Sequence, residues 1–266
     1  MRLKVTVSYD GAHYHGWQKQ SNAHSIQSEI EGMLKKLHKH PVEIVASGRT
    51  DAQVHALGQV FHFDSEKNID AMHWKHAMNS MLPKDIRIQC VEQVADDFHA
   101  RFSAISKCYE YRISYDIDNP FLQQYAGLEK KHLDITYMQE CATIFLGTHD
   151  FTSFTSAKID SRKSRIKTIT RLDVVEDKDM VRLLFEGTGF LRYMVRMLTQ
   201  TLLEAGKHKL TKEEVQMMLD GKDKHLCRYK AEPQGLYLVH VTYGGNGNEN
   251  KLSYTHNKVS SCSWGR

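Results

Sequence analysis

The chain has 266 residues, of which 41% are hydrophobic and only four are prolines, and its formal net charge is +4. This composition excludes an intrinsically disordered chain, and the length fits one large domain or two modest ones. Residues 1–11 alternate charged and apolar types without an apolar core, and no window approaches the roughly 18 uninterrupted apolar residues of a membrane span. We therefore expect a cytoplasmic protein without a membrane anchor.

The first hundred residues alternate between strand and helix patterns. Leu3, Val5 and Val7 alternate with polar residues over positions 2–9, which is the period of a half-buried strand. The later patterns predict a helix over 25–38, strands over 42–46 and 58–63, a helix over 70–81 and a strand over 86–94. The resulting β-α-β-β-α-β order is typical of a ferredoxin-like split βαβ arrangement.

A similar order follows in the second half of the chain. The patterns predict a strand over 107–115, then a helix that Asp134 caps and that stops at Gly147. Two strands follow within 165–186, around the turn Asp177-Lys178-Asp179. The remaining predicted elements are an apolar helix over 190–205 closed by Gly206, a short helix from the capping box of Thr211 and Glu214 to Gly221, and a strand over 236–243. The fold class is therefore α+β, with two ferredoxin-like-related α/β domains at residues 1–104 and 105–244. Residues 245–266 are polar and turn-rich, which predicts a loosely held tail.

The cysteines and histidines do not indicate a metal site. The five cysteines are far apart and none belongs to a C-x-x-C pair, so the sequence supports neither a disulfide framework nor a zinc ribbon. His13 with His15, and His73 with His76, have no second ligand pair nearby. There is also no nucleotide-binding fingerprint, and we expect a protein without metal or cofactor.

The loop Ser47-Gly48-Arg49-Thr50-Asp51 precedes a predicted strand and combines a glycine, a cation, a hydroxyl and a carboxylate. Function concentrates on such loops, but an ordinary turn whose aspartate caps backbone amides has the same composition. Asp51 fits a nucleophile, a general base or a metal ligand, and its residue type does not decide among them.

The sequence also contains two basic clusters, both in the second half of the chain. Arg162, Lys163, Arg165 and Lys167 lie close together in sequence, and Arg192 and Arg196 flank the start of an apolar helix. The first cluster is typical either of a solvated charged loop or of a phosphate-binding surface. The second needs an explanation, because burying an unpaired guanidinium costs several kcal/mol.

Several motifs together resemble the tRNA pseudouridine synthase A family. Gly48-Arg49-Thr50-Asp51-Ala52, continuing to Val54-His55-Ala56, is similar to the segment around that family's nucleophilic aspartate. The further motifs occur in family order from residue 3 to about residue 243, and they are Tyr9-Asp10-Gly11 with Gly16-Trp17-Gln18, Asp97 to Ala104 followed by Tyr109-Glu110-Tyr111, Asp150 to Phe154, Gly189 to Arg196, and Gly235 to Leu238. Each is weak alone, but several in order are specific.

The resemblance implies a fold, a reaction and a set of roles. The two domains would join into a continuous, mostly antiparallel sheet, with helices on one face and an RNA-binding cleft on the other. The reaction would break the N1–C1′ bond of a uridine and rejoin the uracil through C5, without a metal or a cofactor. Asp51 would attack C6 or C1′, Arg196 would pair with it and keep its pKa low, and Tyr109 would stack on the base and relay the C5 proton. From pattern alone, core packing of Tyr109 and a surface position of Arg196 are the competing interpretations.

The implied substrate is the anticodon stem-loop of tRNA, at uridines 38, 39 and 40, bound by a homodimer. Because a paired uridine is inaccessible, the nucleotide must be extruded, and Arg49 is predicted to hold or replace it. The remaining predicted RNA-binding residues are Phe98, His99, Arg101, Arg162, Lys163 and Arg165, of which the cationic ones would contact phosphates.

Three positions depart from the family pattern. Gln53 stands where glycine is usual, Gln200 replaces a small glycine, and Glu232 replaces a proline. A glutamine held at positive φ is strained by roughly 1 kcal/mol, so the geometry of the Asp51 loop is the feature in question.

Two other functions fit parts of the sequence. The first is a catalytically silent RNA-binding protein on the same fold, with Gln53 as the mark of lost activity. The second is a small-molecule hydrolase that uses Asp51 and His55 as acid and base.

Overall fold

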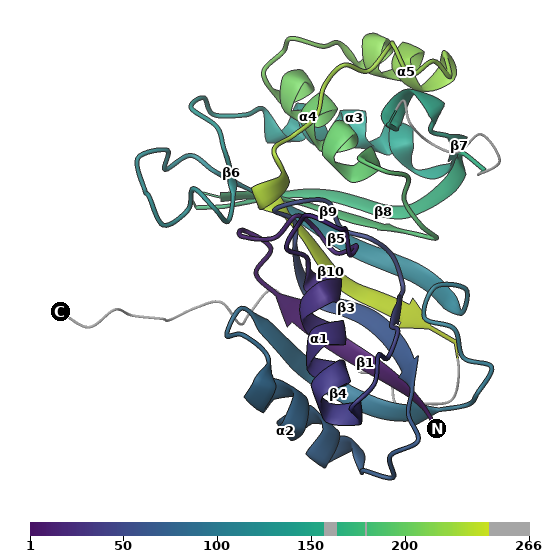
Figure 1. Ribbon diagram of the computed structural model, residues 1–266. Helices are drawn as coiled ribbons and strands as arrows, with labels where there is room; N and C mark the ends of the chain where they lie inside the picture. The colour runs from purple at the N-terminus through teal and green to yellow at the C-terminus, as the bar shows by residue number, and fades with distance from the viewer. Residues whose placement is uncertain (157–163, 179, 245–266) are drawn as a thin grey trace.

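The computed structural model describes residues 1–156, 164–178 and 180–244, and its centre is one large sheet (Figure 1). Within these residues the strand order is β4-β1-β3-β10-β5-β9-β8-β7, with β2 added to β3 and β6 to β5. The pairs β10/β3 and β5/β6 are parallel, and the other pairs are antiparallel. The strands are β1 (Arg2–Tyr9), β2 (Val45–Ala46), β3 (His55–Asp64), β4 (Ile86–Val94), β5 (Ala104–Ser114), β6 (Gly127–Leu128), β7 (Gly147–Asp150), β8 (Ile166–Asp177), β9 (Met180–Gly187) and β10 (Leu236–Tyr243).

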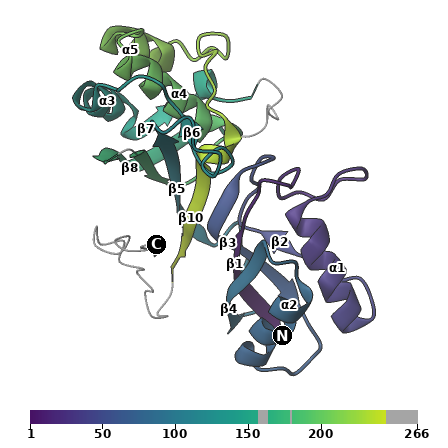
Figure 2. The same cartoon turned by 90° about the vertical axis from the view of Figure 1, so that its left-hand side faces the viewer.

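The helices lie in two groups, one beside each half of the sheet (Figure 1, Figure 2). They are α1 (Ile26–His38), α2 (Ala71–Met81), α3 (Ile135–Ala142), α4 (Met194–Gly206) and α5 (Lys212–Asp220), with short 3₁₀ turns η1 (Thr143–Phe145), η2 (Thr152–Phe154) and η3 (Pro233–Gly235). Local signals fix several helix starts, since Asp134 caps α3 and the predicted capping box of Thr211 and Glu214 opens α5. No described helix is long and apolar enough to cross a membrane.

The structure corrects three predicted helix boundaries. The helix expected from residue 190 begins at Met194, because Tyr193 is left-handed, with φ 66° and ψ −2°, and cannot join a right-handed helix. Its last residue is Gly206, which was expected to lie just beyond it. The helix expected to run to Gly147 ends at Ala142 and gives way to a 3₁₀ turn, while Gly147, at φ 94°, opens β7.

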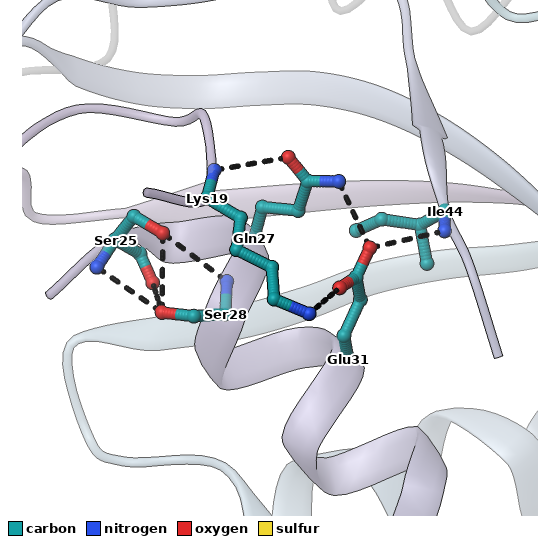
Figure 3. A network of polar contacts seen from close by, with 6 residues as sticks. All are labelled: Lys19, Ser25, Gln27, Ser28, Glu31 and Ile44. Atoms are coloured by element: carbon teal, nitrogen blue, oxygen red, sulfur yellow. Dashed lines mark hydrogen bonds and ion pairs between the residues drawn. The ribbon is translucent and has the colours of Figure 1, made fainter. Parts of the chain in front are cut away.

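Strand β2 is shorter than predicted because α1 holds the chain that precedes it. Ile44 N donates to Glu31 Oε1 at 3.5 Å, so Glu31 supplies an acceptor that a strand neighbour would otherwise provide (Figure 3). Glu31 also accepts from Lys19 Nζ and from Gln27 Nε2, each at 2.9 Å. Only Val45–Ala46 pairs with β3, whereas β3 itself starts early, at His55, because β10 pairs with it there.

The buried apolar side chains form two clusters. One lies around Trp17, Trp74 and Phe61 and includes Leu238 of β10. The other surrounds α4 and includes Val54, which follows the Asp51 loop directly. Tyr109 packs against both clusters, so the middle of β5 lies where the two halves of the structure meet.

Candidate active site

Asp51 and Arg196 form an ion pair between distant parts of the chain. Arg196 Nη1 lies 3.5 Å from Asp51 Oδ2, and the two side chains are 8% and 25% exposed. Arg196 is the third residue of α4, and its Nε donates to Ala231 O at 2.8 Å. The guanidinium is therefore fixed on one side by the backbone and directed on the other toward the carboxylate. This pairing explains how α4 accommodates a buried arginine.

Backbone contacts from the segment after β1 hold the Asp51 loop. Trp17 N donates to Thr50 O at 3.1 Å, and Gln53 N donates to Tyr14 O at 3.1 Å. Gly16 has φ 87°, and a Cβ there would lie 2.6 Å from Thr50 O and 2.9 Å from the carbonyl carbon of Asp51. Only glycine permits this approach of two backbones.

Tyr109 lies in β5, half-buried, with its ring edge-on to Phe190 at a centroid distance of 5.3 Å. Burial raises the pKa of its phenol, and the charges of Tyr9 and Asp51 raise it further. The hydroxyl is therefore protonated at neutral pH. It can donate one hydrogen bond and accept others, but it can take up a proton only as it gives up its own.

The pKa of Asp51 corrects a prediction. Pairing with Arg196 was expected to keep this pKa low, but it is raised above that of an ordinary aspartate. Burial is the largest cause and outweighs the opposing charges of Arg196, Arg192 and Lys230. A carboxylate of raised pKa is more basic, which favours nucleophilic attack once the group is ionised.

The predicted RNA-binding residues fall into separate places. Arg49 is exposed, two residues before Asp51. Phe98 and His99 contact His62 at ring distances of 6.0 and 5.0 Å, and the guanidinium of Arg101 lies over Phe102. His62 is seven residues beyond His55 on β3, a rise of about 23 Å, so this group lies at the far end of the strand.

The basic cluster near residue 165 is only partly visible. Arg162 and Lys163 lie outside the described residues. Arg165 is half-buried immediately before β8, and its carbonyl accepts from Phe151 N at 3.1 Å. The cluster therefore stays a predicted phosphate-binding surface.

His55 is engaged away from Asp51, which argues against the hydrolase. It is buried, its Nδ1 accepts from Gly11 N at 3.1 Å, and its Nε2 lies 2.9 Å from Gln124 O. The carboxylate nearest to its Nδ1 belongs to Asp10, also at 3.1 Å, and burial lowers the pKa of the imidazole. Both ring nitrogens thus join the start of β3 to the segments around Gly11 and Gln124.

Across the described parts of the chain, no three His, Cys, Asp or Glu side chains are grouped to hold a metal ion.

Lys107 lies near the site and was not among the predicted residues. Its Nζ donates to Ser47 O at 2.7 Å, and a Cβ on Gly48 would lie 2.7 Å from the same nitrogen. Burial lowers the pKa of its ammonium to about 8. The strand period offered a signal, since Lys107 is two residues from Tyr109 and shares its face of β5.

Gln200 and Glu232, two of the three departures from the family pattern, both fit their surroundings. Gln200 Nε2 donates to Glu204 Oε1 at 2.9 Å, one turn further along α4. Glu232 has φ −62°, which is the value a proline would impose, and its carbonyl accepts from Tyr111 at 2.8 Å.

Gln53 has φ 64°, so this position of the loop does require the left-handed conformation. We expect Gln53→Gly to raise the free energy of unfolding by up to about 1 kcal/mol, because relief of strain exceeds the added flexibility of the unfolded chain. Urea unfolding measures the difference. Gln53→Ala is the matched control and should give no gain, because alanine meets the same strain. A glycine variant no more stable than the alanine variant would show that the loop is unstrained.

Known proteins resemble this chain over most of its length. The family model described as tRNA pseudouridine synthase matches residues 5–103 and 141–244. The tRNA pseudouridine synthase A of an Exiguobacterium species is 43% identical over 242 residues, covering 91% of this chain and 98% of the relative. That of Bacillus subtilis is 43% identical over 247 residues, covering 91% and 99%.

A chain from the crystal structure of a Cbf5-Nop10-Gar1 complex matches 75% of this chain and 54% of its own length, at 11% identity and a TM-score of 0.31. That likeness is too distant to support an argument. The family match and the curated relatives each span most of the sequence. The chain therefore belongs to the tRNA pseudouridine synthase A family, a family of isomerases.

Proposed function

We propose that the protein isomerises uridine to pseudouridine in the anticodon stem-loop of tRNA, at uridines 38, 39 and 40, with Asp51 as nucleophile. The observation that carries the proposal is the 3.5 Å ion pair between Asp51 and Arg196. The Asp51 carboxylate in this pair is partly exposed and has a raised pKa. Tyr109 lies near enough to Asp51 for the aspartate's charge to raise the pKa of the phenol.

The reaction rearranges bonds within one nucleotide. The N1–C1′ bond breaks, the uracil turns, and a C5–C1′ bond forms. C5 loses its proton and N1 gains one, so the product is an isomer of the substrate and no oxidant or group donor is consumed. Asp51 provides the covalent intermediate by attacking C6 or C1′. Tyr109 stacks on the uracil, and its hydroxyl relays the C5 proton by passing on its own proton as it receives the one from C5.

The RNA must present an extruded uridine to this site. Arg49, two residues from the nucleophile, is proposed to hold or replace the flipped nucleotide. Contacts to the rest of the stem-loop are proposed for Phe98, His99, Arg101, Arg162, Lys163 and Arg165. We further propose that residues 1–104 and 105–244 are two domains that face the RNA across a cleft, and that two copies of the chain form a cytoplasmic homodimer.

The test of this function is tritium release from tRNA labelled at uracil C5. The wild-type protein should release tritium in proportion to the pseudouridine formed. Binding of tRNA without any release would favour the alternative, a catalytically silent RNA-binding protein.

The phenol of Tyr109 gives a sharper prediction. Tyr109→Phe should lower kcat by roughly 10²–10⁴-fold and leave the Kd for tRNA nearly unchanged, because the ring still stacks while the proton-transfer group is gone. Single-turnover tritium release and filter binding measure the two effects. Tyr115→Phe, which removes a hydroxyl that accepts from Leu133 N, is the control and should keep normal turnover. A normal rate for Tyr109→Phe would remove any role of its hydroxyl in proton transfer.

A further inference from the structure

Three cations surround the ring of Tyr193, directly before helix α4. Arg192 and Lys230 each lie 4.7 Å from the ring centroid, and Arg196 lies 5.5 Å from it. Arg192 Nη2 also donates to the hydroxyl of Tyr193 at 2.8 Å. Attraction between cations and the ring face offsets part of the repulsion among the three positive charges.

The same cations act on the nucleophile. Arg196, Arg192 and Lys230 all lower the pKa of Asp51 through their charges. Arg196 has Asp51 as its carboxylate partner, but the ion pairs of the described residues assign no carboxylate to Arg192 or to Lys230. Both of these side chains are exposed. Within the described part of the chain, two exposed cations without a carboxylate partner therefore lie beside a site that already contains its own ion pair.

Hydrogen bonds anchor the backbone segments that carry these two cations. Arg192 O accepts from Ser156 N at 3.2 Å and from Thr155 Oγ1 at 3.3 Å. Lys230 precedes Ala231, whose N donates to Arg196 O at 3.0 Å and whose O accepts from Arg196 Nε. The two exposed cations are thus attached to the same framework that orients the catalytic guanidinium.

Tyr193 itself is held in an unfavourable backbone conformation. At φ 66° a residue with a side chain costs roughly 1–2 kcal/mol relative to the usual regions. Strain of this kind concentrates at functional sites. Tyr193 combines this strained backbone with a ring that contacts all three cations.

We propose that Arg192 and Lys230, gathered on the ring of Tyr193, bind a backbone phosphodiester adjoining the target nucleotide. The inference rests on the proposed function, because an extruded uridine brings its flanking phosphates to the Asp51 site. A guanidinium fork and an ammonium bind phosphate oxygens well, and here they lie beside the nucleophile without an ion-pair partner among the residues that the structure describes. Neutralisation by the phosphodiester would hold the nucleotide while its base turns.

The experiment measures Kd of an unmodified tRNA transcript against salt for the wild type, Arg192→Gln, Lys230→Gln and the double variant. The slope of log Kd against log salt should fall in magnitude by about one for each phosphate contact removed, and Kd for the double variant should rise by at least roughly tenfold at low salt. Lys36→Gln, which removes an exposed cation from the last turn of α1, is the matched control and should leave the slope unchanged. Arg192→Lys combined with Lys230→Arg keeps both charges and should restore the wild-type slope.

The outcomes separate this inference from the proposed function. If the wild type releases tritium from labelled tRNA but the double variant has the salt slope of Lys36→Gln, the phosphate site is overturned and the function stands. A shift in the pH profile of kcat without a change in slope also overturns it, because the cations would then act on Asp51 alone. If the wild type releases no tritium, the function fails, whatever the slopes are.

Discussion

Asp51→Asn is expected to abolish isomerisation, lowering kcat by at least roughly 10⁴-fold, while tRNA affinity stays close to that of the wild type. An amide has nearly the shape of a carboxylate but cannot ionise, and it is a poor nucleophile. The affinity should survive because the proposed RNA contacts come from other residues. Single-turnover tritium release and filter binding measure the two quantities. Retention of most of the activity would end the candidacy of Asp51.

The same substitution should not destabilise the fold at neutral pH. Burial raises the pKa of Asp51, so the folded state prefers the neutral carboxyl. The stability that this preference contributes is present below the unfolded-state pKa and is lost as pH rises through the raised folded-state pKa. Asparagine remains neutral, and its amide oxygen can still accept a hydrogen bond from the guanidinium of Arg196, so this buried cation keeps a polar partner. The free energy of unfolding of the variant should therefore equal or exceed that of the wild type at pH 7, with the gap closing in acid. Urea unfolding at both pH values tests this, and a variant clearly less stable at pH 7 would show that the carboxylate stabilises the fold.

Local signals allowed much of the fold to be predicted. The alternation of residues 2–9 and the capping box of Thr211 and Glu214 depend on neighbours a few positions away, and both appear as expected. The position of β10 between β3 and β5 depends on pairing with strands more than a hundred residues earlier. No periodicity encodes that choice, and the early start of β3 at His55 follows from it.

Some features of the candidate site could likewise be predicted from the sequence, and others depend on tertiary contacts. Motif resemblance was enough to name Asp51, Tyr109 and Arg196, and the structure brings Asp51 within 3.5 Å of Arg196. The direction of the Asp51 pKa shift was predicted wrongly, because it depends on how far burial outweighs the nearby charges. Lys230 was not predicted, because its place beside Tyr193 depends on the hydrogen bonds between Ala231 and Arg196, which are distant in the sequence.

Arg196→Gln is expected to lower kcat at neutral pH by roughly 10²–10³-fold, because it removes a fixed positive charge from the reacting carboxylate. It also removes the strongest of the charges that oppose burial in setting the pKa of Asp51. That pKa should therefore rise further. Activity requires the ionised carboxylate, and it falls as pH drops through this pKa. The acid limb of the kcat profile should consequently lie at higher pH in the variant than in the wild type.

Arg196→Lys separates the charge from the geometry of the guanidinium. It keeps a cation near Asp51, so the acid limb should stay closer to that of the wild type. A lysine cannot reproduce both the bond from Nε to Ala231 O and the contact of Nη1 with Asp51, so kcat should remain reduced. Tritium release between pH 5 and pH 9 measures both profiles. If Arg196→Gln and the wild type share one acid limb, the titrating group is not Asp51, and the ion pair serves to fix α4 against the Asp51 loop.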